Sequence, residues 1–184
     1  MIELEQAART VKKGGVIAYP TEAVFGLGCD PFNQQAVERL LNIKHRHEHQ
    51  GLILIAATWS VFEPLIASIE PAILANAHAT WPGPFTWIFP ANTRVPAWLC
   101  GPNHTIALRV TAHPIARTLC STLNAPLVST SANLAKHPPL RDAESVARIF
   151  GHKLDFVLPG AVDRFAQPTE IRDVLTGKVL RESK

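Results

Sequence analysis

The sequence has little of what marks secreted, zinc-binding or membrane proteins. Only three of its 184 residues are cysteine, Cys29, Cys100 and Cys120, and no two of them form a CxxC pair. An odd number of widely spaced cysteines predicts neither a disulfide framework nor a zinc site, so we expect reduced and mostly buried thiols. No run of 18 apolar residues occurs, and we therefore expect no membrane-spanning helix.

Signals for export and for domain division are missing as well. Glu3 and Glu5 stand where a secretory signal would have basic and then apolar residues. There are no internal repeats, no low-complexity segments and no linker rich in Pro, Gly or Ser. With 47% hydrophobic residues, the chain can bury one substantial core. We expect one cytoplasmic domain spanning residues 1–184, with no membrane partner.

The charge is only mildly basic, at a formal +3. This value permits an anionic substrate or RNA but requires neither. His45, His47 and His49 alternate and could in principle chelate a metal. Because no carboxylate or cysteine nearby completes a ligand set, we expect a solvated loop and no metal site.

Hydrophobic spacing and capping residues predict helices and strands in mixed order. Asn33 and Asp142 are suited to cap helices, and Pro71 and Pro114 to first helical turns. Helices are expected at 4–11, 33–44, 71 onward, 114–123 and 142–150, with a short one after Thr58. Strands are expected at 16–19, 51–56, 85–89, 105–110, 125–128, 155–158 and within 171–181. Since they do not follow a clean βαβ repeat, we expect an α/β fold (α+β-like) with an open, twisted mixed sheet and helices on its faces.

The segment Ser129-Thr130-Ser131-Ala132-Asn133 brings three hydroxyls and an amide together after a short apolar run. Open α/β sheets bind ligands at the carboxyl ends of their strands. The alternative is a Ser/Thr-rich turn whose side chains bond their own backbone. Tyr19-Pro20-Thr21-Glu22 also follows an apolar run, and Lys44-His45-Arg46 places two cations at the end of a predicted helix. Hydroxyls that hold oxyanions and cations that neutralise phosphate are complementary parts of one site.

With these segments, the chain resembles the YrdC/TsaC family of L-threonylcarbamoyladenylate synthases. The resemblance runs from about Gly15 to Arg181 and rests on the order and spacing of several motifs. The motifs are residues 18–28 (AYPTEAVFGLG), Lys44-His45-Arg46, residues 51–55 (GLILI), residues 81–84 (WPGP), residues 107–110 (ALRV) and Ser131-Ala132-Asn133.

The resemblance implies a YrdC-like fold and a nucleotidyltransferase. Such an enzyme makes L-threonylcarbamoyladenylate from L-threonine, bicarbonate and ATP and releases pyrophosphate, for threonylcarbamoyladenosine modification of tRNA next to the anticodon. ATP would be a substrate accompanied by Mg²⁺, without a tightly bound cofactor. The resemblance also implies partner proteins that use the intermediate, and weak binding of tRNA or double-stranded RNA.

The resemblance further assigns residues to the two sides of the site, but no catalytic residue. The expected threonine contacts are Thr21, Arg109, Ser131 and Thr169. The expected ATP contacts are Lys44, Arg46, Gln50, Thr105, Ser129, Asn133, Arg141 and Arg181.

The residues alone leave alternatives for the cations. Lys44 and Arg46 suit phosphate oxygens, but they could also be solvated charges favoured by a helix C-terminus. Arg109, among apolar neighbours, is costly to bury without an anionic partner. That partner could be a ligand or a carboxylate of the protein. The chain departs from the family pattern at several positions: Gln50 stands where Lys or Asn is usual, Ile55 replaces a histidine of the longer members, and Ala135-Lys136 replaces Ser-Gly.

Two other functions compete with the synthase. A double-stranded RNA or ribosome-precursor binding module without catalysis fits the mild basicity, but the cations are scattered and no RNA-binding motif occurs. The related carbamoyl-transfer module of hydrogenase-maturation proteins would bring acylphosphatase-like and zinc-finger segments. This sequence contains neither.

Overall fold

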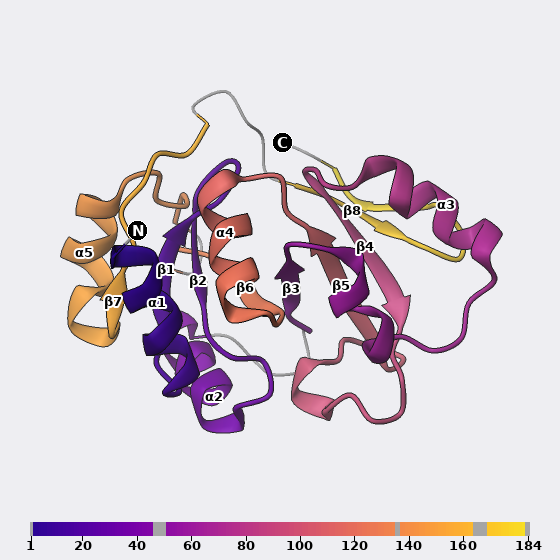
Figure 1. Ribbon diagram of the computed structural model, residues 1–184, viewed down its shortest axis with the longest axis horizontal. Helices are drawn as coiled ribbons and strands as arrows, with labels where there is room; N and C mark the ends of the chain where they lie inside the picture. Colours follow the sequence, from indigo (N-terminus) through magenta and orange to yellow (C-terminus); the bar gives the residue numbers. More distant parts are fainter. Residues whose placement is uncertain (1, 46–50, 135–136, 164–168, 183–184) are drawn as a thin grey trace.

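One mixed sheet organises the molecule. The computed structural model describes residues 2–45, 51–134, 137–163 and 169–182. Within them, nine strands pair in the order β7-β1-β2-β6-β3-β5-β4-β8-β9, which runs across the molecule in Figure 1. The strands are β1 Ile17–Pro20, β2 Phe25–Gly28, β3 Ile53–Ala56, β4 Phe85–Pro90, β5 Thr105–Val110, β6 Leu127–Ser131, β7 Phe156–Val157, β8 Glu170–Asp173 and β9 Val179–Arg181.

Parallel and antiparallel pairs alternate irregularly across this sheet. Strands β3 and β5, β1 and β7, and β4 and β8 are parallel, whereas the remaining neighbours are antiparallel. The two edge strands, β7 and β9, do not pair with each other. The expected open mixed sheet is confirmed.

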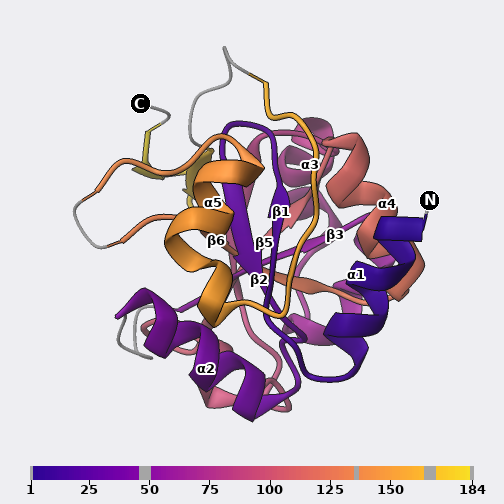
Figure 2. The same ribbon diagram turned by 90° about the vertical axis from the view of Figure 1, so that its left-hand side faces the viewer.

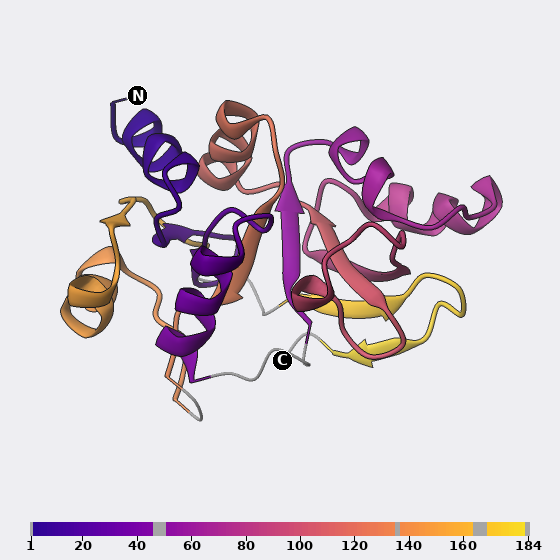
Figure 3. The same ribbon diagram turned by 90° about the horizontal axis from the view of Figure 1, so that it is seen from below.

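Five α-helices cover the two faces of the sheet in the described residues. They are α1 Ile2–Lys12, α2 Gln34–Lys44, α3 Pro71–Thr80, α4 Pro114–Leu123 and α5 Ala143–Phe150. Figure 2 shows α1 and α4 on one side of β1 and β2, with α2 and α5 on the other. Figure 3 shows α1 and α4 together on one side of β3 as well.

The hydrophobic core accordingly has two parts. The smaller one joins α1 and α4 to Ile17, Tyr19, Ile55 and Leu127. The larger one lies on the other face and includes Leu54, Leu108 and Val128 together with α2 and α5. Side chains of a strand alternate between the faces, so both faces of β3 and β6 are apolar, as their unbroken hydrophobic runs predict.

Local capping explains why the helix boundaries agree with the sequence. The side chains of Asn33 and Asp142 accept hydrogen bonds from Ala36 N and Ser145 N, which satisfies backbone donors at the first turns of α2 and α5. Pro71 and Pro114 begin α3 and α4 as expected. The helix expected after Thr58 is only a 3₁₀ turn, Trp59–Val61.

The main error of the sequence interpretation is β2, since no strand is expected between residues 19 and 51. Phe25–Gly28 contains two glycines, and glycine weakens a strand pattern. Pairing with β1 and β6 on its two sides makes the strand form nevertheless. In addition, Ser129, Thr130 and Ser131 do not follow β6 but are its last three residues. None of the described helices combines the length and the apolar content needed to cross a bilayer.

Candidate functional site

A small cavity is lined by residues of β2, β3, β5, β6 and β9 and of the neighbouring loops. It has a volume of about 180 Å³. This is below the roughly 300–1,000 Å³ of typical pockets for drug-sized ligands, so it suits a small molecule or one part of a larger one. The lining residues are Thr21, Ala23, Val24, Phe25, Gly26, Ile53, Arg109, Ser129, Thr130, Ser131, Pro139, Thr169 and Arg181. All four expected threonine contacts are among them, with Ser129 and Arg181 of the expected ATP contacts.

The pairing of β2 with β6 and the lack of a side chain at Gly26 leave room for this cavity. Gly26 of β2 pairs with Ser131 of β6. A Cβ atom on Gly26 would lie 3.2 Å from Cγ2 of Thr21 and 3.4 Å from Cζ of Tyr19. Glycine therefore allows the hydroxyls of β6 and the loop after β1 to approach the same space.

Arg109 is the buried cation of the cavity. It lies near the end of β5, is 5% exposed, and forms an ion pair with Glu22, with Nη2 3.4 Å from Oε2. The carboxylate partner that the sequence left open is thus present within the protein. Even so, Nε of Arg109 is buried without a hydrogen-bond partner among the described residues. A buried donor without a partner calls for a functional explanation.

Glu22 is the residue that sequence reasoning missed. Its Oε1 accepts hydrogen bonds from Thr111 Oγ1 at 2.7 Å and from Ala112 N at 3.3 Å. Burial alone would raise the pKa of Glu22, but the charge of Arg109 and the hydrogen bond from Thr111 hold that pKa below its ordinary value. Glu22 therefore stays ionised beside Arg109. A sequence signal existed, since a buried arginine needs an anion and Glu22 directly follows Thr21.

The hydroxyls around the cavity are held by short bonds. Oγ1 of Thr21 donates to Val24 O at 2.6 Å. Ser131 Oγ donates to Asn133 Oδ1 at 2.7 Å. On the opposite wall, Nη2 of Arg181 donates to the carbonyl oxygen of Thr169 at 2.7 Å. The first two bonds fix the direction of the Thr21 and Ser131 hydroxyls, whose oxygens can still accept from a ligand.

Lys44 binds the protein rather than pointing freely toward solvent. It is 8% exposed, and its Nζ donates to Ser131 O at 2.5 Å, Asn133 O at 2.7 Å and Asn133 Oδ1 at 2.6 Å. The amide of Asn133 also donates through Nδ2 to His137 O at 2.9 Å. Lys44 and Asn133 thus shape the end of β6.

The other expected ATP contacts lie around the cavity or outside the described residues. Arg141 donates through Nε to the carbonyl oxygen of Ala23, a lining residue, at 2.9 Å. Thr105 begins β5 and donates its hydroxyl to Pro102 O at 2.9 Å. It does not line the cavity, but alternation places Thr105, Ala107 and Arg109 on one face of β5. Arg46 and Gln50 lie outside the described residues, as do His47, His49 and the Ala135-Lys136 departure.

A partly exposed strip continues from the cavity along this face. Ile53 of β3 pairs with both Ala107 of β5 and Ser129 of β6, and Ile53 and Ala107 are only half-buried. The strip leads from Arg109 toward Thr105. A ligand larger than the cavity has space to extend along it.

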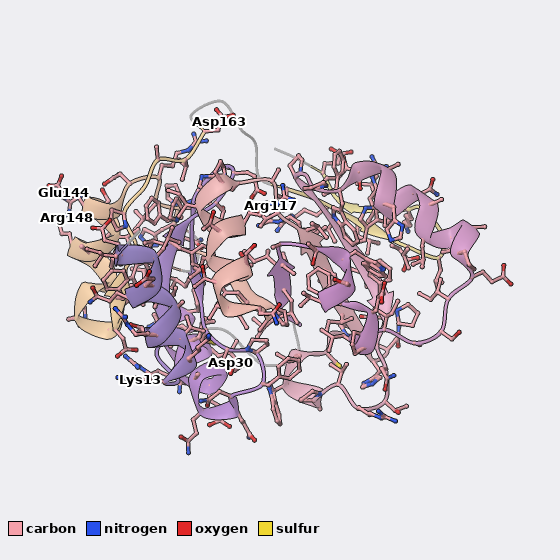
Figure 4. All side chains as sticks on the ribbon, in the orientation of Figure 1. Lys13, Asp30, Arg117, Glu144, Arg148 and Asp163 are labelled. Atoms are coloured by element: carbon pink, nitrogen blue, oxygen red, sulfur yellow. The ribbon has the colours of Figure 1, made fainter. Side chains whose placement is uncertain are left out.

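Two other hollows differ in chemistry. One, of about 720 Å³, is an open polar depression at the start of α2 lined by Asp30, Phe32 and Glu38 among others. The other, of about 400 Å³, is lined mainly by Trp59, Trp81 and Val110, with Arg117 of α4 on it (Figure 4). Neither combines a buried cation with hydroxyls. The described residues contain no group of three or more His, Cys, Asp or Glu that could hold a metal ion.

The cysteines do not take part in the site. Cys29, Cys100 and Cys120 are free and buried, as expected. Burial raises the pKa of the thiols of Cys29 and Cys120 to about 12. Both thiols are therefore protonated at neutral pH and are not nucleophiles.

Comparison with known proteins places this geometry in context. The family Sua5_yciO_yrdC, described as "Telomere recombination", matches residues 9–183. The threonylcarbamoyl-AMP synthase of Coxiella burnetii is 51% identical over 178 residues, which cover 97% of this chain and 96% of that protein. The enzyme of the same name from Nitrosococcus oceani is 50% identical over 175 residues, 95% of each chain.

A solved structure agrees with the fold. The crystal structure of P. abyssi Sua5 complexed with L-threonine superposes with a TM-score of 0.90 at 30% sequence identity. The match covers 98% of this chain and 54% of that one, so the chain spans about half of the P. abyssi protein.

Proposed function

Since the chain belongs to the Sua5/YciO/YrdC family, we propose that it is a threonylcarbamoyl-AMP synthase, which forms L-threonylcarbamoyladenylate from L-threonine, bicarbonate and ATP and releases pyrophosphate. The resemblance seen in the sequence is confirmed by the family match. The curated relatives are named for this activity over nearly their whole length. They do not favour the RNA-binding module.

The observation that carries the proposal is a buried arginine in a small hydroxyl-lined cavity. Arg109 suits the carboxylate of an amino acid, because guanidinium and carboxylate form strong charge-assisted bonds. The oxygens of Thr21, Ser131 and Thr169 suit the amine and hydroxyl of threonine. The volume of about 180 Å³ fits the amino acid better than a nucleotide.

We place ATP along the strip that leaves the cavity. Its α-phosphate must meet the carbamate oxygen formed on the threonine amine, so the nucleotide has to begin at the cavity and extend outward. Arg181 lines the cavity and provides a cation that can reach a phosphate group. Thr105 and Asn133 lie beside the path along which the nucleotide would extend. Adenylation depends chiefly on positioning and on the spreading of phosphate charge. The residues named here act by holding both reactants in line.

Mg²⁺ would arrive with ATP rather than reside in the protein. The polar side chains that line the cavity carry hydroxyls and cations, and such a set does not form a carboxylate cage for the ion. Mg²⁺ commonly keeps several waters and binds through substrate phosphates. When bound, it neutralises phosphate charge.

The remaining partners follow from the chemistry of the product. A mixed carbamate–phosphate anhydride hydrolyses readily, so we propose that protein partners take it up and transfer the threonylcarbamoyl group to tRNA, with any direct RNA contact being weak. We also propose a cytoplasmic location, where free thiols such as the three buried cysteines stay reduced.

Pyrophosphate release tests the proposed function directly. The protein is incubated with ATP and Mg²⁺ while L-threonine and bicarbonate are added separately and together, and the product is identified by mass spectrometry. Pyrophosphate should appear only when both are present. Equal ATP turnover with both omitted would refute the synthase assignment.

A further inference from the structure

The two carboxylate oxygens of Glu22 have different partners, because one accepts hydrogen bonds from Thr111 and Ala112 and the other faces Arg109. Oε1 accepts from Thr111 Oγ1 and Ala112 N, at 2.7 and 3.3 Å. Oε2 lies 3.4 Å from Nη2 of Arg109. The two hydrogen bonds on Oε1 fix the carboxylate plane, so the position of Oε2 is fixed as well.

The support of Glu22 extends through two further segments. The hydroxyl of Thr111 accepts from His113 N at 3.2 Å, which links Glu22 to the residue that caps α4. The carbonyl oxygen of Glu22 accepts from Asp163 N at 2.9 Å. In Figure 4, Asp163 lies beyond the end of the β1–β2 hairpin. Glu22 is therefore anchored at both its backbone and its side chain.

Arg109 and Glu22 are nevertheless not saturated with hydrogen bonds. Glu22 Oε2 and Arg109 Nε are buried without a hydrogen-bond partner among the described residues. The side chains are 12% and 6% exposed, so the charges attract each other in a low-dielectric environment. Glu22 does not line the cavity, whereas Arg109 does. The carboxylate can influence a ligand only through the guanidinium.

We propose that Glu22 is a positioning residue for amino-acid binding, which holds the guanidinium of Arg109 in the orientation that receives the substrate carboxylate. The inference rests on the proposed function. An arginine side chain has several rotatable bonds, and its fork binds a carboxylate well only in one plane. With Glu22 in place the fork is preorganised, and binding does not have to order it.

The test is a double-mutant cycle read as the Kd of L-threonine by isothermal titration calorimetry. Glu22→Gln keeps the shape and an acceptor for Thr111 but removes the charge that orients Arg109. We expect the Kd for threonine to rise about 10- to 100-fold, and the Kd for ATP to change less than about twofold. In an Arg109→Gln background, Glu22→Gln should have no further effect, because the residue through which it acts is gone.

Two further variants control for structural damage. Glu5→Gln makes the same change in an exposed pair with Arg9 on α1, at 4.0 Å, and should leave both constants unchanged. Thr111→Val removes one bond to Glu22 while keeping the charge, and should weaken threonine about three- to tenfold. If Glu22→Gln does not fold, the Kd of threonine for Thr111→Val tests the positioning role instead.

The outcomes separate this inference from the proposed function. A wild-type protein that neither binds threonine nor forms the product contradicts the synthase itself. A wild-type protein that does both, with threonine affinity unchanged in Glu22→Gln and in Thr111→Val, contradicts the positioning role alone. Additive losses in the Glu22→Gln, Arg109→Gln pair would also overturn it.

Discussion

At the scale of single residues, Lys44 combines a structural position with an expected role in ATP binding. Its ammonium group donates to three oxygens of Ser131 and Asn133. A lysine in this position holds the end of β6 in the shape that the cavity requires. Its expected role in phosphate binding therefore has to be separated experimentally from its contribution to folding.

Lys44→Met keeps the aliphatic stem and removes the three donors. We expect the free energy of unfolding to fall by about 2–4 kcal/mol, because three part-buried acceptors lose bonds to a charged group. Urea denaturation measures this, and Lys12→Met on the exposed side of α1 serves as the control. Unchanged stability with weakened ATP binding would contradict the structural role.

The ionisation of Glu22 gives a second residue-scale prediction. Burial alone would raise its pKa, but Arg109 and the hydrogen bond from Thr111 keep the pKa below the ordinary value of 4.5. The contribution of Glu22 to stability is thus complete above the pKa of the unfolded chain, and it is lost as the pH falls through the lower pKa of the folded protein.

Denaturation of wild type and Glu22→Gln between pH 7 and pH 3 measures this contribution. At pH 7 the variant should be less stable by roughly 3 kcal/mol, since Arg109 loses its buried partner. The difference should shrink as the pH falls below about 4.5. The lowered pKa values of Asp142 and Asp155 affect both proteins equally and cancel. Parallel stability curves over the whole range would refute the assignment.

At the scale of elements, β2 shows how neighbours can impose a conformation. Gly28 pairs with Ile17 of β1, and a Cβ atom there would collide with the carbonyl oxygen of Val128 and lie 2.8 Å from Cε1 of Tyr19. The strand packs closely between its neighbours because it carries glycine at this position. Strand propensity alone therefore gave the wrong prediction.

Gly28→Ala should push β2 away from its neighbours. We expect a loss of about 2–3 kcal/mol in the free energy of unfolding, since backbone and a buried ring cannot easily give way. Gly151→Ala is the matched control, because its nearest atom would be 3.9 Å away, and it should be neutral or stabilising by up to about 1 kcal/mol. Similar losses in both variants would show that close packing around β2 is not the cause.

At the scale of the whole molecule, the cavity joins parts of the sheet that are distant along the chain. Its walls come from β2 and β6 on one side and from Arg109, Thr169 and Arg181 on the other. A ligand that contacts both sides should stabilise both together. Ligand binding is then coupled to global stability by mass action.

Threonine at 100 times its Kd should stabilise the protein by about 2.7 kcal/mol and raise Tm by roughly 5–11 °C. Hydrogen exchange should show slower exchange in residues 21–26, 129–131 and 169–171 together, with little change in α3, which does not line the cavity. Slower exchange confined to one wall of the cavity would contradict a binding site that both walls share.

The sequence by itself determined those features that depend on neighbours along the chain. Asn33, Asp142, Pro71 and Pro114 set helix starts, because caps and proline geometry act within one turn. A continuous apolar run located β3, since burial on both faces excludes polar residues. The order of motifs also identified the family, and six of the residues expected to contact ligands line the cavity.

Only the tertiary structure decided which distant groups meet. The formation of β2 depended on strands on both sides of it, and the partner of Arg109 proved to be Glu22. Lys44 was a candidate for phosphate binding, and only the folded chain brought its ammonium group to Ser131 and Asn133. Charges and hydrogen bonds select partners by distance in space, and folding sets that distance independently of separation along the chain.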